Sequence, residues 1–436
     1  MKVKVIGAGL AGCEAAWQLA NNGIEVELYE MKPVKFSPAH SYEGFAELVC
    51  SNSLKASRVD SAAGMLKEEM RRLGSLIMEC AEKTKVSAGG ALAVNREEFS
   101  DCVTQVIKSH PLIKVISEEV SEIPDGNVII ATGPLTSGDL AKSIAEKCGN
   151  YLSFFDAAAP IVTFESLDKD LVFFASRYGK GEDDYINCPM NKEEYLAFYN
   201  ALINAESAPL KEFEKEQFKV YEGCMPIEVL GKRGEDTMRF GPLKPVGLTD
   251  PRTERRPYAV VQLRKENNDG TLYNLVGFQT NLKFGEQKRV FSLITGLQNA
   301  EFVRFGVMHR NTFIDSPRLL DEHFCMRNCP EIYFAGQITG VEGYAESAAS
   351  GISAGLNFAR KLHGKEPIEF PSETMLGSLS KYISNQSVVN FQPMGCNMGI
   401  LPELPERIRD KKIKYQALAD RGLSELQKTL IEKGIG

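Results

Sequence analysis

The sequence predicts an α/β protein in which one parallel-sheet domain is interrupted by an inserted α+β domain. Two observations indicate this fold class. Residues 3–30 have the pattern of a strand, a glycine-rich turn, a helix and a second strand, which opens a βαβ unit. A similar strand and small-residue turn occur again at 332–337, after a stretch with a different pattern of expected strands and helices. A chain that re-enters its first domain in this way predicts one domain at 1–160 plus 319–436 and an insertion at 161–318.

Length, charge and cysteine usage exclude several classes of protein. A chain of 436 residues is long enough for two or three domains with buried cores. A net charge of −7 excludes a polybasic protein that binds nucleic acid through its overall field. Ten cysteines are too sparse for a disulfide-stapled secreted domain, and no segment has a signal peptide's core or the ~18 apolar residues of a membrane span. We therefore expect a soluble cytoplasmic protein with reduced thiols and no membrane partner.

The opening unit has the pattern of a dinucleotide-binding turn. A strand at 3–6 leads into the turn, a helix follows to Asn22, and a second strand at 24–29 ends at an acidic residue. Gly9 lets the backbone approach a pyrophosphate, Gly12 lets the helix pack on the strand, and the helix N-terminus favours an anion. The expected contacts of the cofactor here are Gly7, Ala8, Gly9, Leu10, Ala11, Gly12 and Glu30.

Two later segments indicate which dinucleotide is bound. Residues 128–133 and 332–337 resemble the ATG and C-terminal motifs of glutathione-reductase-like FAD proteins, and this resemblance implies a Rossmann-type FAD domain. Gln337 stands where many such proteins have an aspartate. A helix at 344–362, beginning near 340–343, would point its positive end at the flavin and favour the anionic reduced form. The resemblance adds cofactor contacts at Thr132, Gly133, Gly336, Gln337, Gly343 and Tyr344.

The rest of the chain gives weaker signals. In the insertion, residues 173–178 and 258–263 are expected to be strands and 192–205 an amphipathic helix. Beyond residue 371 the chain reads as mostly helical and polar. His323, Cys325 and Cys329 are zinc-ligand types without a second pair at finger spacing, so we expect a surface loop and no metal site.

Several motifs give a specific resemblance that spans residues 1 to about 400. They are LVCSNSLKA, EGCMPIE, GLTDPRTERRPYAVVQLR, TNLKFGEQKRVF, GVMHRNTF, AGQITGVEGYAESAASG and FQPMGCNMG. With the opening turn they resemble the folate- and FAD-dependent tRNA (uracil-5-)-methyltransferase family, TrmFO or Gid. The resemblance implies 5,10-methylenetetrahydrofolate as carbon donor, FAD as hydride carrier and NAD(P)H as reductant. The implied product is 5-methyluridine at position 54 in the T loop of bacterial tRNA.

The resemblance also assigns two thiols. Thiolate addition at C6 of uracil turns the ring into an enolate whose C5 attacks a one-carbon iminium. Deprotonation of C5, elimination and hydride transfer then complete the methyl group. By resemblance Cys224 is the nucleophile, and Cys50 is a second active-site thiol that acts as base or as shield. On composition alone, a single free cysteine is more often a small buried hydrophobe.

Contacts to the substrates are open to two interpretations. His309 would stack on a pterin or be an ordinary loop histidine. The basic residues of 252–265 would bind RNA phosphates or form a solvated face, and the resemblance favours the RNA contact for Arg255, Arg256 and Arg264. Residues 407–414 are a second basic candidate, with a solvated helix end as the simpler interpretation.

Three classes of function remain. The first is the folate-dependent tRNA methyltransferase. The second is another FAD enzyme, either a wobble-uridine modifier of the MnmG type or a thiol oxidoreductase, and the third is a non-catalytic RNA-binding flavoprotein. Cys50 and Cys224 in family motifs, with no CxxC and no long C-terminal helical domain, favour the first. The sequence implies no obligate protein partner. It leaves open NADH against NADPH, the oligomeric state and the tRNA docking surface.

Overall fold

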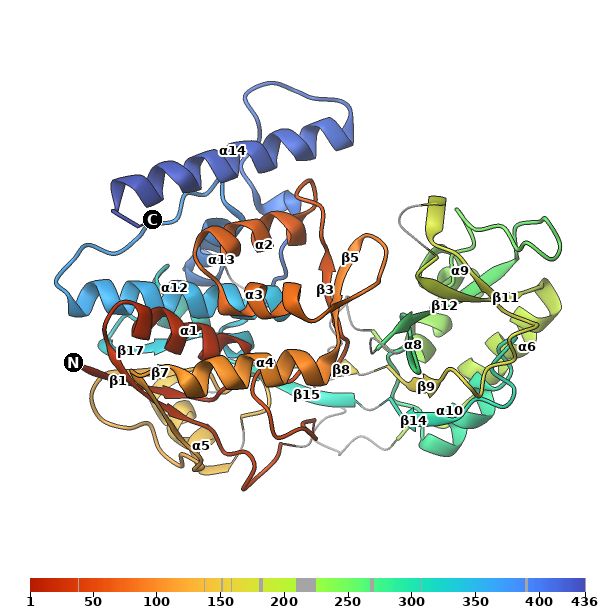
Figure 1. The fold of residues 1–436 in the computed structure, drawn as a ribbon, viewed down its shortest axis with the longest axis horizontal. Helices are drawn as coiled ribbons and strands as arrows, with labels where there is room; N and C mark the ends of the chain where they lie inside the picture. Colours follow the sequence, from red (N-terminus) through yellow and green to blue (C-terminus); the bar gives the residue numbers. More distant parts are fainter. Residues whose placement is uncertain are drawn as a thin grey trace.

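The computed structural model shows two lobes (Figure 1). It describes residues 1–436 except 38, 137, 150–151, 158, 180–182, 209–224, 267–269, 307, 389–390 and 436, and it describes only the backbone of 152–157 and 308–310. The larger lobe holds both termini, and the smaller lobe is formed by the middle of the chain. This arrangement confirms the predicted fold class, an α/β domain with a parallel sheet interrupted by an inserted α+β domain.

The larger lobe is built on a six-stranded sheet. Its order is β16-β17-β7-β1-β2-β6, with β1 in the middle. The strands are β1 (Lys2–Ile6), β2 (Glu25–Tyr29), β6 (Ile113–Ile116), β7 (Val128–Ile130), β16 (Cys325–Met326) and β17 (Cys329–Phe334). All of them pair in parallel except β16, which is antiparallel at the edge. The carboxyl ends of the parallel strands therefore meet at one edge of the sheet, where such folds bind ligands.

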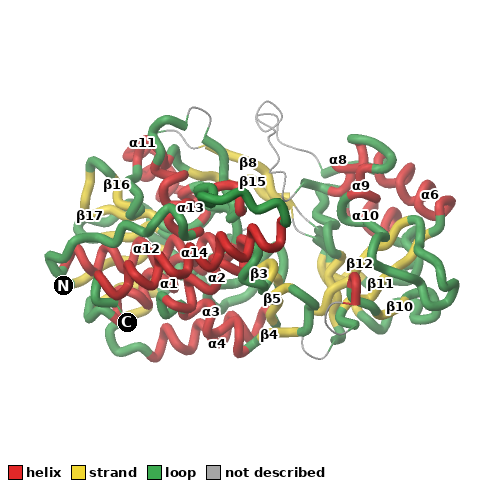
Figure 2. The backbone as a smooth tube through the Cα atoms, turned by 90° about the horizontal axis from the view of Figure 1, so that it is seen from above, coloured by secondary structure: helices red, strands yellow, loops and turns green. Residues whose placement is uncertain are grey.

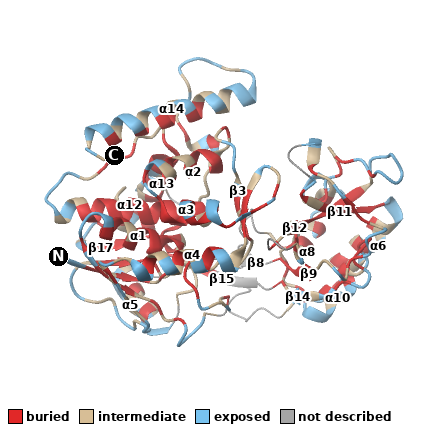
Figure 3. Ribbon diagram, viewed as in Figure 1, coloured by how far each residue is buried: buried red, intermediate tan, exposed pale blue. Residues whose placement is uncertain are grey.

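The helices of the larger lobe pack around this sheet or on one another, and its strands are buried (Figure 3). They are α1 (Leu10–Asn21), α2 (Ala62–Arg72), α3 (Leu76–Lys83), α4 (Arg96–Ser109), α5 (Gly138–Cys148), α11 (Ser316–Leu319), α12 (Tyr344–Leu362), α13 (Met375–Ser384) and α14 (Lys411–Glu432). The predicted helix at 344–362 is confirmed. It packs against α1 so closely that a Cβ at Gly351 would lie 2.2 Å from the carbonyl oxygen of Ala11. Glycine is therefore required at this crossing.

The chain passes between the lobes through a two-stranded ribbon. This ribbon pairs β8 (Leu152–Ala157) with β15 (Met308–Phe313) in antiparallel register, and Figure 2 shows it beside the junction. Phe313 and Ile314 already belong to the core of the larger lobe. The returning chain thus rejoins the first domain a few residues before the expected boundary at 318. A small sheet of β3 (Ser53–Ala56), β5 (Ala91–Val94) and β4 (Lys85–Val86) lies on the larger lobe's side of this junction.

The smaller lobe has its own sheet and core. The sheet order is β10-β11-β12-β13-β9-β14, and its pairs are antiparallel. The strands are β9 (Ile161–Thr163), β10 (Phe173–Phe174), β11 (Tyr185–Met190), β12 (Ala259–Lys265), β13 (Leu272–Leu275) and β14 (Phe302–Arg304). The helices are α6 (Lys192–Ile203), α8 (Ile227–Lys232), α9 (Thr237–Phe240) and α10 (Phe284–Phe291). Phe198, Phe278 and Phe291 pack together in its core.

Two predicted elements of local structure differ from the observed ones. The strand expected at 173–178 ends after Phe174, because the chain then enters a 3₁₀ turn in which Tyr178 has a φ of 59°. The surface loop expected around Cys325 and Cys329 is wrong, since these residues form the β16–β17 hairpin at the edge of the sheet and Cys325 is buried. Among the described residues, no group of three His, Cys, Asp or Glu side chains is arranged to hold a metal. No helix in the described ranges has the length and apolar character needed to span a membrane.

Candidate functional site

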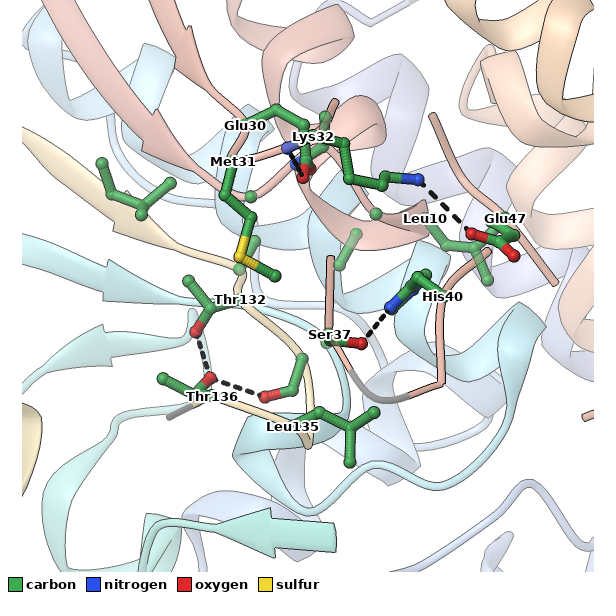
Figure 4. Close-up of a pocket in the computed structure, with 18 of the residues that line it drawn as sticks. Leu10, Glu30, Met31, Lys32, Ser37, His40, Glu47, Thr132, Leu135 and Thr136 are labelled. Atoms are coloured by element: carbon green, nitrogen blue, oxygen red, sulfur yellow. Dashed lines mark hydrogen bonds and ion pairs between the residues drawn. The ribbon is translucent and has the colours of Figure 1, made fainter. Parts of the chain in front are cut away.

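A cavity of about 200 Å³ lies at the carboxyl edge of the parallel sheet (Figure 4). Its walls come from the turns that follow β1, β2, β7 and β17. The expected cofactor contacts that line it are Gly7, Ala8, Gly9, Leu10, Ala11, Glu30, Thr132, Gly133, Gly336, Gln337 and Tyr344. Gly12 and Gly343 do not line it. The structure therefore brings four separate segments of the sequence to one site.

The glycines of the first turn have different roles. A Cβ at Gly12 would lie 1.8 Å from the carbonyl oxygen of Gly7, so this position serves the packing of α1 on β1. A Cβ at Gly9 would have no heavy atom within 4 Å, and its φ of −75° is an ordinary one. The space in front of Gly9 belongs to the cavity. It can receive a pyrophosphate at the N-terminus of α1.

Glu30 joins the end of β2 to the same turn. Its carboxylate accepts the backbone N–H of Ala8 at 2.8 Å and that of Lys32 at 3.0 Å. The side chain is buried, yet it lines the cavity. This position suits a carboxylate that recognises a ribose hydroxyl. In the turn that follows β7, the hydroxyls of Thr132 and Thr136 are 2.6 Å apart at the cavity wall.

Sequence reasoning missed the loop that closes over the cavity. Lys32, Ser37, His40 and Glu47 all line the cavity (Figure 4). The ammonium of Lys32 donates to the carbonyl oxygen of Tyr42 at 3.0 Å and lies 3.5 Å from a carboxylate oxygen of Glu47. Burial lowers the pKa of His40, so its ring is neutral at pH 7. No local motif marks these residues, because only the return of the loop at Ala46 onto Ala8 brings them to the site.

Cys50 lies beside this cavity and is partly exposed. Its backbone N–H donates to the phenol oxygen of Tyr344 at 2.7 Å, and the N–H of Ser51 donates to the same oxygen at 3.2 Å. Tyr344 and Val49 both line the cavity. Burial raises the pKa of the Tyr344 phenol, which therefore stays protonated at neutral pH.

Three arginines hold the segment around Cys50. The Arg96 guanidinium donates to the carbonyl oxygen of Leu48 at 2.7 Å, and that of Arg304 donates to Val49 at 2.5 Å. Arg264 donates to the hydroxyl of Ser51 at 2.7 Å. Arg96 comes from α4, whereas the other two come from β12 and β14 of the smaller lobe. Residues from both lobes therefore hold the segment that carries Cys50, and the charge of Arg96 is itself paired with Glu266.

The position of Arg264 requires a correction. We expected this residue to contact RNA phosphates, but its side chain is only 8% exposed. Its guanidinium donates hydrogen bonds to the hydroxyl of Ser51 and, at 3.0 Å, to the side-chain oxygen of Asn52. A phosphate at the surface cannot reach it. Arg255 and Arg256, by contrast, are exposed on the smaller lobe.

Two expected site residues are not tested by the structure. Cys224 lies outside the described residues. His309 belongs to β15, where only the backbone is described. The pairing of Cys50 with Cys224 therefore stays a prediction.

A second buried cluster supports the start of α12. Glu346 accepts the ammonium of Lys55 at 2.7 Å and the backbone N–H of Cys396 at 3.0 Å. Burial by itself would raise the pKa of Glu346, but the charge of Lys55 and the hydrogen bonds from Cys396 lower it. The buried ammonium of Lys67 donates to the carbonyl oxygens of Leu54 and Ala56, and burial lowers its pKa to about 8. These contacts fix β3 and the 394–397 segment against the N-terminus of α12.

Comparison with known proteins agrees with this architecture. The sequence profile of the family "Glucose inhibited division protein A" matches residues 2–366. A protein of Acetivibrio thermocellus named methylenetetrahydrofolate--tRNA-(uracil-5-)-methyltransferase TrmFO is 62% identical over 427 residues, 98% of each chain. The protein of the same name from Enterococcus faecalis is 60% identical over 423 residues, 97% of each chain.

Among solved structures, GidA of Aquifex aeolicus shares the fold. Its form I crystal structure superposes with a TM-score of 0.70 at 15% identity, covering 98% of this chain and 76% of that one. The form II crystal gives a TM-score of 0.68 at 16% identity. With the identity to the named relatives over nearly the whole length, these matches show that the chain belongs to the TrmFO family, within the wider glucose inhibited division protein A family.

Proposed function

We propose that this protein is a methylenetetrahydrofolate–tRNA (uracil-5-)-methyltransferase that forms 5-methyluridine at position 54 of the T loop. The observation that carries the proposal is the position of Cys50. This thiol lies at the edge of a dinucleotide-type cavity, and its backbone is bonded to Tyr344 of the cavity wall. The names of relatives with about 60% identity support the same activity.

The cofactor that fits the cavity is FAD. Gly9 leaves space for a pyrophosphate, Glu30 suits a ribose, and Gly336 and Tyr344 line the opposite side of the cavity. When bound, FAD supplies the hydride that completes the methyl group. The protein's part is to bind this group and hold a thiol beside it. NADH or NADPH is the proposed source of the electrons.

The two thiols divide the chemistry at the uracil ring. The thiolate of Cys224 adds to C6, which places negative charge on the O4 side of the ring and makes C5 nucleophilic. C5 then attacks the methylene carbon of 5,10-methylenetetrahydrofolate. Loss of the C5 proton breaks the carbon–nitrogen bond and releases tetrahydrofolate, and the exocyclic methylene left on C5 accepts a hydride as the Cys224 thiolate leaves C6. Cys50 acts as the base for that proton or as a shield of the site. Arg304, which holds its segment, also supplies positive charge that favours an anionic ring, whereas the charge of Arg96 is paired with Glu266 at 2.7 Å.

The remaining substrate contacts are two exposed arginines and one histidine assigned by resemblance. Arg255 and Arg256 are exposed on the smaller lobe and suit phosphates of the tRNA T arm. His309 is the proposed stacking partner of the pterin. No disulfide joins the described cysteines, which fits a cytoplasmic enzyme that uses thiol chemistry on tRNA.

The test is in vitro methylation of a T-arm transcript. Purified protein with FAD, NADPH and isotopically labelled methylenetetrahydrofolate should transfer labelled carbon to one uridine, measured by mass spectrometry of digested RNA. A transcript with uridine 54 replaced by cytidine is the control. Labelling of the anticodon wobble uridine instead would favour an MnmG-type activity, and no labelling of any RNA would reject the proposal.

A further inference from the structure

A ladder of phenylalanine rings reaches the surface of the smaller lobe. The rings of Phe302 and Phe305 are stacked with centroids 5.4 Å apart and an interplanar angle of 12°. Phe305 in turn stacks on Phe284 at 4.9 Å and 15°. At its inner end the ladder reaches Phe291 of the core, 6.3 Å from Phe302. The outermost ring, Phe284, is 55% exposed, so a flat group can extend the stack.

The ladder lies next to the candidate site. Phe302 and Phe305 flank Arg304, whose guanidinium donates to the carbonyl oxygen of Val49 in the Cys50 segment. Figure 1 places β14 on the side of the smaller lobe that faces the larger one. The inner part of the ladder is therefore carried by the same strand that contacts the Cys50 segment.

The charges around Phe284 suit a polyanion. Lys283 precedes it, and Lys288 lies one turn further along α10, with both side chains exposed. Lys283 pairs with Glu206 at 2.5 Å, but both partners are more than half exposed. Such a pair contributes little and can exchange its carboxylate for a phosphate. Arg289 is already paired with Glu286 of the same helix.

We propose that the Phe302–Phe305–Phe284 ladder is a stacking platform for a nucleobase of the RNA substrate, with Lys283 and Lys288 contacting the adjacent phosphates. This inference rests on the proposed function. A uracil whose C5 and C6 are to react must leave its stack, and its neighbour then loses a stacking partner. Aromatic side chains replace that partner in proteins that bind unpaired RNA, without selecting the base.

The test compares Phe284 with another exposed phenylalanine. Phe284→Ala removes the outer ring, and Phe284→Trp restores an aromatic surface. Phe240→Ala is the matched control, because Phe240 is 81% exposed on α9 of the same lobe. The probe is a T-arm RNA hairpin that carries 2-aminopurine at one loop purine. The fluorescence of the 2-aminopurine follows binding of the hairpin in the absence of methylation. Flavin absorbance shows whether the larger lobe is intact.

We expect Phe284→Ala to raise the Kd of the hairpin roughly 5- to 150-fold and to abolish the quenching of 2-aminopurine. Phe284→Trp should restore both, and Phe240→Ala should change neither. Unchanged hairpin affinity in Phe284→Ala would overturn the inference. So would a raised KM for methylenetetrahydrofolate alone, which would make the ladder a pterin site, or an altered oligomeric state alone, which would make it a protein contact.

Failure of the proposed function would look different. Wild-type protein that methylates the hairpin while Phe284→Ala binds it normally rejects only the stacking platform. Wild-type protein that binds the hairpin through Phe284 but forms no 5-methyluridine rejects the methyltransferase. Wild-type protein that does not bind the hairpin rejects both.

Discussion

The phenol oxygen of Tyr344 accepts the backbone N–H of Cys50, although the two residues are 294 positions apart in the chain. Tyr344 is the first residue of α12, and it also accepts the N–H of Ser51. The cavity wall and the backbone of Cys50 are thus held together by one hydroxyl group. Because two backbone donors share this acceptor, its removal should lower both the stability of the fold and the methylation activity.

Tyr344→Phe should separate these effects. The variant keeps the ring but leaves two N–H groups without their acceptor, which costs about 1–3 kcal/mol in the free energy of unfolding where the donors stay dry. We expect reduced methylation with FAD still bound. Urea unfolding and flavin absorbance measure the two quantities. Full activity in this variant would show that the hydroxyl does not position Cys50.

Gly9→Val tests the cavity as the site of FAD. Since a Cβ at Gly9 meets no atom within 4 Å, the variant should fold normally, with its side chain in the space proposed for the pyrophosphate. We expect protein with native circular dichroism and no bound flavin. Gly12→Val is the contrasting control, because its Cβ would clash with the Gly7 carbonyl and should impair folding itself. Full FAD occupancy in Gly9→Val would place the cofactor elsewhere.

The elements that the sequence predicted well are those with local signals. The β1–turn–α1–β2 unit and the helix at 344–362 follow from apolar periodicity and glycine positions within a few residues. The insertion helix at 192–203 is also local, since Asn191 and Glu194 form a capping box at its start.

The features that were missed depend on contacts between distant segments. Arg264 belongs to a run of basic residues that predicts an exposed face. On β12, however, its side chain donates to Ser51, 213 residues earlier in the chain. The β16–β17 hairpin is equally hidden, because its pairing is visible only once β17 takes its place in the sheet. Composition can mark such residues as charged or small, but it cannot say what they face.

Glu14 should give the protein a pH-dependent stability. This buried carboxylate accepts the N–H of Ile77 at 2.9 Å and the hydroxyl of Ser75 at the start of α3. Burial raises its pKa to about 7 despite these bonds. The folded protein thus holds the proton more tightly than the unfolded chain, so stability from this group is greatest below about pH 4.5 and is lost as pH rises through 7.

Glu14→Gln removes that titration. We expect the slope of unfolding free energy against pH between about 4.5 and 7 to become flatter in this variant, as measured by urea unfolding at several pH values. Glu97→Gln, which changes an exposed carboxylate on α4, is the control and should keep the wild-type slope. An unchanged slope in Glu14→Gln would mean that another group carries the dependence.

The arginines of the smaller lobe should fall into two classes. Exposed Arg255 and Arg256, if they contact phosphates, should on joint replacement by alanine weaken tRNA binding and flatten its dependence on salt by up to ~2 units of slope. Arg264→Ala should instead reduce methylation with little change of the slope, because its guanidinium is buried against Ser51 and Asn52. Filter binding at several salt concentrations separates the two. A reduced salt slope in Arg264→Ala would contradict this division.

The two thiols should fail at different steps. If the Cys224 thiolate attacks C6, Cys224→Ala prevents the enolate and should abolish both methylation and any covalent bond to RNA, with FAD retained. Cys50, as base or shield, acts after that bond forms, so Cys50→Ala should lose methylation but still trap the adduct. RNA with 5-fluorouracil at the target strengthens the test, because fluorine cannot leave C5 as a proton and the complex should stall. Peptide mapping then locates the bond: attachment to Cys50 reverses the assignment, and attachment to neither cysteine removes thiol addition from the mechanism.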